Sequence, residues 1–148
     1  MSDYSVLVVE DDANMQGFLQ EVLASEGYSV LTASDGQEAL TQAFARKPDL
    51  ILLDLLMPNL DGVTFCRAIR ADQRTHDVPI VVVTSLNMQA KLEESMAAGA
   101  DDFIGKPFDV RDLIARVHSM LEVKHITNPY ERMKQYTLAL RQLRPPST

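Results

Sequence analysis

The chain has 148 residues, with 21 acidic against 14 basic side chains and a formal net charge of −7. This length suits one compact domain, and 46% apolar residues are enough for a buried core. The negative charge argues against nucleic-acid binding by this domain alone, because such binding depends on basic patches. With one cysteine, no bilayer-length apolar run and no basic signal-peptide region, we expect a cytoplasmic protein without membrane contact.

Short apolar runs alternate along the chain with longer amphipathic stretches. The predicted strands are Ser5–Val9, Ser29–Ala33, Leu50–Leu53, Ile80–Thr84 and Phe103–Ile104. The predicted helices are Asn14–Ser25, Gln37–Arg46, Val63–Arg70, Met88–Ala98 and Val110–Leu121. Continuous β-branched runs are typical of strands buried on both faces of a parallel sheet. The pattern predicts an α/β, (βα)5 flavodoxin-like fold: a doubly wound five-stranded parallel sheet in the order 2-1-3-4-5.

Residues 123–148 depart from this pattern, and we expect them to form a helical extension and linker after a domain of residues 1–122. The segment Asn128–Glu131 offers an N-cap, a proline at the first helical position and a capping-box glutamate. An additional C-terminal helix is therefore predicted to about Leu143. Its apolar side chains at 3-4-3 spacing are Met133, Tyr136, Leu140 and Leu143. Fewer than two heptads are weak evidence for a coiled coil.

Polar side chains follow the predicted strands at the points where these strands end. Glu10 and Asp11 follow the first strand, Asp54 the third, Thr84 ends the fourth, and Lys106 follows the fifth. Parallel strands end at the same edge of a sheet, and the first and third strands are neighbours in the predicted order. We therefore expect the three carboxylates to converge at that edge.

This set of side chains suits phosphoryl transfer. Three close carboxylates repel one another, and Mg²⁺ removes that repulsion while leaving room for a phosphate oxygen. A carboxylate such as Asp54 can attack phosphorus and form an aspartyl phosphate. Lys106 is placed to neutralise the added charge, and the Thr84 hydroxyl can donate to a phosphoryl oxygen. We find no motif that would hold a nucleotide.

Four motifs at the strand ends resemble the receiver domain of two-component response regulators. They are VLVVEDD at 6–12, ILLDLLMPNLDG at 51–62, PIVVVTS at 79–85 and GADDFIGKPF at 99–108. The resemblance covers about residues 4–122 and implies a CheY-like fold. Four motifs in order, each at the end of a predicted strand, are far more specific than any one of them alone.

The resemblance implies a role for each residue of the cluster. Asp54 would be the phosphoacceptor. Asp11 and Asp54 would ligate Mg²⁺ directly, together with the backbone carbonyl of Leu56, while Glu10 would act through a water molecule. Lys106 would bind the phosphoryl group, and the peptide bond before Pro107 would be cis.

The resemblance also implies a switch. Thr84 would be the hydroxyl that senses the phosphoryl group, and Phe103 would be the rotating aromatic residue. Leu56 and Leu86 flank the path of the hydrolytic water and cannot orient it, so we expect slow self-dephosphorylation.

The implied function is a phosphoacceptor module with a histidine kinase or phosphotransfer protein as its donor. The fourth helix, fifth strand and fifth helix would form the partner or homodimer surface, and the C-terminal helix is a second candidate for dimerisation. Residues proposed for that surface are Lys91, Asp101, Arg111 and Arg116. Asp101 and Asp102 are otherwise expected to be solvated.

Alternative functions remain open at this point. A phosphatase with Asp54 as nucleophile would usually carry a second acid two residues later, where this chain has Leu56. A receiver that binds partners without phosphorylation is a further alternative. The Pro-Pro tail favours the N-terminal module of a longer regulator over a stand-alone receiver.

Overall fold

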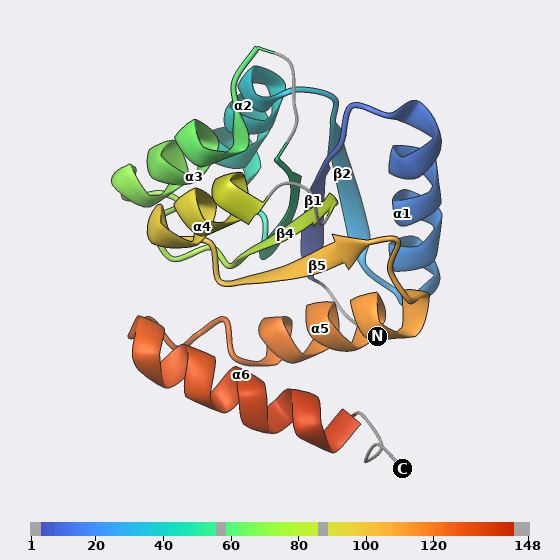
Figure 1. Cartoon of the computed structure of the whole chain (residues 1–148), viewed down its shortest axis with the longest axis vertical. Helices are drawn as coiled ribbons and strands as arrows, with labels where there is room; N and C mark the ends of the chain where they lie inside the picture. Colours follow the sequence, from blue (N-terminus) through green and yellow to red (C-terminus); the bar gives the residue numbers. More distant parts are fainter. Residues whose placement is uncertain (1–3, 56–58, 86–88, 144–148) are drawn as a thin grey trace.

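The computed structural model describes residues 4–55, 59–85 and 89–143, which form a parallel sheet between two layers of helices (Figure 1). The strands are β1 (Ser5–Val9), β2 (Ser29–Ala33), β3 (Leu50–Asp54), β4 (Ile80–Ser85) and β5 (Asp102–Lys106). Their order is β2-β1-β3-β4-β5, and every neighbouring pair is parallel. The predicted fold class and strand order are confirmed.

Six helices lie within the described residues. They are α1 (Ala13–Ser25), α2 (Gly36–Arg46), α3 (Gly62–Ala71), α4 (Gln89–Ala97), α5 (Val110–Glu122) and α6 (Pro129–Leu143). α2, α3 and α4 cover one face of the sheet, α1 and α5 cover the other, and α6 lies against α5 on its outer side (Figure 1). No described helix is long and apolar enough to cross a membrane.

The core divides into two halves because side chains alternate along each strand. In β1, Val6 and Val8 pack with the residues beneath α1 and α5, whereas Leu7 and Val9 pack with those beneath α2, α3 and α4. All four are essentially inaccessible to solvent. Burial on both faces explains why the strand reads as an unbroken apolar run.

Helix boundaries follow local capping chemistry. Asp12 and Asp109 each accept a hydrogen bond from the backbone N–H two residues later, at 3.0 and 2.8 Å, and cap α1 and α5. Asn128 accepts from the backbone N–H of Glu131 at 2.9 Å, so α6 begins as predicted. Only β5 differs markedly from the prediction: it continues to Lys106, because its last residues pair with the end of β4. The predicted residue Met88 and the tail from 144 lie outside the described residues.

The thiol of Cys66 is fully buried on α3, and burial raises its pKa to about 12. Because the thiolate is the reactive form, we expect Cys66 to resist thiol reagents at neutral pH while the chain is folded. Reaction with a chromogenic disulfide should be complete in denaturant and negligible without it. Rapid labelling of the native chain would contradict this burial.

Candidate functional site

Sheet register brings the predicted acidic residues together. Val9 pairs with Leu53 across β1 and β3, so the next residues on each strand emerge at the same edge. One carboxylate oxygen from each of Glu10, Asp11 and Asp54 lies within 4.8 Å of the others. The predicted convergence of these three acids is therefore present in the structure.

The three carboxylates differ in their surroundings. Glu10 and Asp54 are buried, at 3% and 9% exposure, whereas Asp11 is open to solvent. Burial raises the pKa of Glu10, and neighbouring Asp54 raises it further, while the hydrogen bond from Lys106 opposes both effects. The buried pair is therefore short of positive charge, and an added cation would be favoured there.

Lys106 enters this cluster from the end of β5. Its Nζ lies 2.9 Å from Glu10 Oε1 and 3.8 Å from Asp54 Oδ2. Burial by itself would lower the pKa of Lys106, but the hydrogen bond to Glu10 and the charge of Asp54 leave it raised. Lys106 is therefore held in its charged form beside the acids. The peptide bond between Lys106 and Pro107 is cis, as the family resemblance implied.

The two predicted switch residues lie in different places relative to this cluster. Thr84 is buried and follows Val83, the residue that pairs with Asp54, so it lies at the same sheet edge. Phe103 lies nearer the start of β5 and is 40% exposed, outside the carboxylate cluster. Leu56 and Leu86 lie outside the described residues. Slow self-dephosphorylation and the Leu56 carbonyl ligand stay predictions.

The donor atoms fit a hard divalent cation. Mg²⁺ prefers oxygen ligands at about 2.0–2.1 Å, so oxygens on opposite sides of the ion are about 4.2 Å apart. The three carboxylate oxygens lie within 4.8 Å of one another, which is close to that distance. One carboxylate could therefore contact the ion through a water molecule. No histidine or cysteine takes part in this group.

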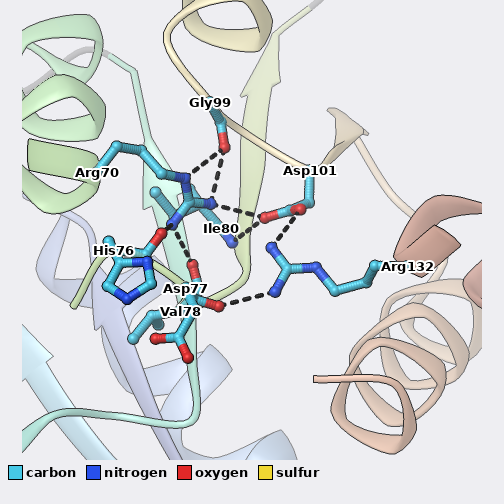
Figure 2. A network of polar contacts seen from close by, with 8 residues as sticks. All are labelled: Arg70, His76, Asp77, Val78, Ile80, Gly99, Asp101 and Arg132. Atoms are coloured by element: carbon cyan, nitrogen blue, oxygen red, sulfur yellow. Dashed lines mark hydrogen bonds and ion pairs between the residues drawn. The ribbon is translucent and has the colours of Figure 1, made fainter. Parts of the chain in front are cut away.

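A second cluster of charged side chains was missed by the sequence analysis. Asp101 was expected to be solvated, but one of its carboxylate oxygens lies 2.9 Å from Arg70 Nη2 and the other 2.7 Å from Arg132 Nη2 (Figure 2). The expectation is wrong because α6 covers this part of the molecule. Gly99 has a positive φ of 117°, and a Cβ there would lie 2.7 Å from Arg70 Cγ, so glycine leaves space for that arginine.

Asp102 is also paired rather than solvated. It accepts hydrogen bonds from Arg116 Nη1 and from the Tyr136 hydroxyl of α6. Burial raises the pKa of the Tyr136 hydroxyl, and the charge of Asp102 adds to that effect. Of the four residues predicted for a partner surface, Asp101 and Arg116 are therefore engaged by side chains from other elements, and Lys91 pairs with Glu94 on its own helix at 4.0 Å.

Comparison with known proteins matches this architecture to one family. The model of the response regulator receiver domain matches residues 6–118. The alkaline phosphatase synthesis transcriptional regulatory protein PhoP of Bacillus subtilis (strain 168) is 40% identical over 129 residues. The match covers 87% of this chain and 53% of PhoP, so the chain spans about half the length of that relative.

Solved structures of a response regulator and of a receiver domain superpose on this chain. A putative response regulator from Chloroflexus aurantiacus J-10-fl superposes with a TM-score of 0.77 at 34% identity, covering 82% of this chain and 99% of that one. The receiver domain of the sensor histidine kinase PA1611 from Pseudomonas aeruginosa PAO1 gives a TM-score of 0.76 at 32% identity, with the same coverage. That structure has a magnesium ion coordinated in its active site cleft.

Proposed function

We propose that this chain, which belongs to the response regulator receiver domain family of two-component signalling, is switched by Mg²⁺-dependent phosphorylation of Asp54. The observation that carries the proposal is the convergence of Glu10, Asp11, Asp54 and Lys106 at one sheet edge. A cluster of acids beside one held lysine suits a nucleophilic carboxylate that must accept a dianionic group.

In the proposed reaction a carboxylate oxygen of Asp54 attacks phosphorus while the bond from phosphorus to the donor's leaving group breaks. Glu10, Asp11, Asp54 and the Leu56 carbonyl would hold Mg²⁺, which supplies charge neutralisation and in-line orientation when bound. Lys106 turns from the carboxylates toward the new phosphoryl oxygens. Thr84 donates its hydroxyl to one of them, and Phe103 moves toward the space that Thr84 leaves.

The proposed donor is a sensor histidine kinase or a phosphotransfer protein in the cytoplasm. PhoP of Bacillus subtilis, the relative described above, is a transcriptional regulatory protein about twice as long as the matched region. We therefore propose that this receiver controls an output module, such as a DNA-binding one, and that the receiver does not bind DNA itself. We also propose that the receiver domain ends near residue 122 and that residues 123–148 form a helical extension and linker.

Acetyl phosphate tests this function without knowledge of the kinase. In the presence of Mg²⁺ the purified chain is expected to gain the mass of one phosphoryl group, and chelation of the metal by EDTA is expected to prevent the gain. Intact-protein mass spectrometry measures both results. No mass gain with Mg²⁺ present would leave a receiver that binds partners without phosphorylation.

Substitution of Lys106 by methionine is expected to slow phosphorylation by about 100-fold or more, because removing one preorganised charge from a site of developing negative charge costs about that much. Methionine keeps the length of the side chain and removes its cation. Lys134→Met is the matched control, since Lys134 is exposed on α6. Time courses with acetyl phosphate measure the rates, and equal rates for wild type and Lys106→Met would contradict the assigned role.

A further inference from the structure

Helix α6 is attached to the domain by few buried side chains. It has 15 residues, and only Arg132 and Tyr136 among them are buried. An isolated helix of about 12–15 residues is marginal in water, so α6 depends on docking for its helical structure. Elements with little buried apolar surface open at low free-energy cost. Because α6 lies outside the two helix layers, against α5, its release leaves both faces of the sheet covered (Figure 1).

The first attachment is a polar network at the start of α6. Arg132 donates to the backbone carbonyl of Asp77 at 2.7 Å and to Asp101 Oδ1 at 2.7 Å, and Asp101 Oδ2 accepts from Arg70 and from the backbone N–H of Ile80, both at 2.9 Å (Figure 2). Arg132 Nε meets no acceptor among the described residues. Such a contact is specific in its geometry, but a poorly compensated buried charge contributes little net stability.

The second attachment is at the first residue of β5. The Tyr136 hydroxyl donates to Asp102, while its ring packs in the core half that includes Leu113 and Val117 of α5. Arg116 donates to the same Asp102 oxygen at 2.6 Å. With α6 docked, Asp101, Asp102 and Arg116 all have partners within the chain.

Strand β5 connects this attachment to the carboxylate cluster. It begins at Asp102, which holds Tyr136, and ends at Lys106, which holds Glu10 and lies near Asp54. The two residues are four apart on one strand, so their side chains share a face and lie about 13 Å apart at 3.3 Å per residue. The backbone of β5 is therefore a continuous connection between the Lys106 contacts and the Asp102 contacts.

We propose that α6 is a displaceable cover on the surface formed by β5 and α5, and that phosphoryl occupancy of Asp54 weakens its docking. The inference rests on the proposed function. A phosphoryl group adds about 1.5 to 2 negative charges and draws Lys106 toward it. Hydrogen bonds weaken steeply when their geometry changes, so a shift of β5 loosens the contact between Asp102 and Tyr136. Release removes Arg132 from Asp101 and Tyr136 from Asp102, while Arg70 and Arg116 stay paired with these carboxylates. The uncovered edges of the two carboxylates can then accept a basic side chain from a partner protein.

Amide hydrogen exchange of the full chain tests this coupling, with beryllofluoride and Mg²⁺ as the phosphoryl analogue. We expect exchange in residues 133–143 to accelerate about 5- to 150-fold on adding the analogue, the usual range for coupled sites. Exchange in α1 serves as the internal control and is expected not to change. Unchanged or slower exchange in α6, with the analogue demonstrably bound, would overturn the proposal and leave the proposed function intact. Failure of the analogue to bind would overturn both.

Matched variants in α6 test whether weakening the docking of this helix changes the affinity of the chain for the phosphoryl analogue. Tyr136→Phe removes the hydroxyl that reaches Asp102, while Tyr130→Phe makes the same change at a side chain that is 80% exposed. Coupling is reciprocal, so Tyr136→Phe is expected to bind beryllofluoride more tightly, by at most the factor that the analogue imposes on α6. Arg132→Gln, with Arg141→Gln as its control, should behave likewise. Equal analogue affinity in wild type and both test variants would show that α6 is structural only.

Discussion

Replacing Asp54 by asparagine is expected to abolish phosphorylation of this chain by acetyl phosphate. The amide cannot act as the attacking carboxylate oxygen, so no aspartyl phosphate forms. The fold should survive, because Asp54 is one cause of the raised pKa of Glu10, and removing that neighbouring charge relieves repulsion in the buried site. Intact mass after incubation with acetyl phosphate and Mg²⁺ gives the result directly.

Asp109→Asn is the matched control for this experiment. Asp109 caps α5, and asparagine caps helices about as well as aspartate does. The control variant should therefore gain the phosphoryl mass as the wild type does. If Asp54→Asn still gains that mass while it is folded, the acceptor is another residue and the role assigned to Asp54 is wrong.

Replacing Asp101 by asparagine is expected to lower the free energy of unfolding by about 3 kcal/mol or more, since removing one partner of a buried ion pair leaves the other charge uncompensated. Burial lowers the pKa of Arg70, and the charge of Asp101 opposes that effect. Arg132 can regain water if α6 leaves the domain, but Arg70 on α3 remains held by the carbonyls of His76, Val78 and Gly99. Most of the loss is therefore expected to come from Arg70.

Asp72→Asn provides the comparison for this loss. Asp72 also pairs with an arginine, Arg74 Nη2 at 2.8 Å, but the Arg74 side chain is 59% exposed and the Asp72 side chain 27%, so water reaches this pair more readily. Exposed pairs contribute about 1 kcal/mol or less, so this variant should unfold nearly as the wild type does. Urea unfolding followed by far-ultraviolet circular dichroism measures both variants. Equal losses would mean that the Asp101 network is not stabilising.

The predictions that succeeded depend on local sequence features and on one topological rule. A β-branched run predicts a buried strand wherever it lies, and the acids after β1 and β3 converge because parallel strands end at one edge. Lys106 lies 96 residues from Glu10 in sequence, yet its contact with Glu10 follows from the position of β5 in the sheet. The convergence of these side chains at one sheet edge therefore follows from the sequence.

The prediction that Asp101 and Asp102 are solvated failed for a different reason. Whether a charge is exposed depends on what covers it, and these acids are covered by a helix that begins 28 residues after Asp101 and 27 after Asp102, at Pro129. The sequence neighbours of Asp101 and Asp102 do not indicate that a later helix packs over these acids. An arginine at position 132 on the buried side of α6 was the available signal, because a buried arginine requires an acidic partner.

The elements, the strand order and the carboxylate edge could all be predicted from the sequence, because each follows from periodicity, capping and chain direction. The position of α6 could not be predicted, since it depends on contacts between residues far apart in the chain. An amphipathic helix shows that it has an apolar side but not which surface it meets. Tyr136 and Leu140, whose 3-4-3 spacing was weak evidence for a coiled coil, pack against the chain's own core. The apolar side of α6 is therefore used within the chain, because the surface of α5 lies beside it.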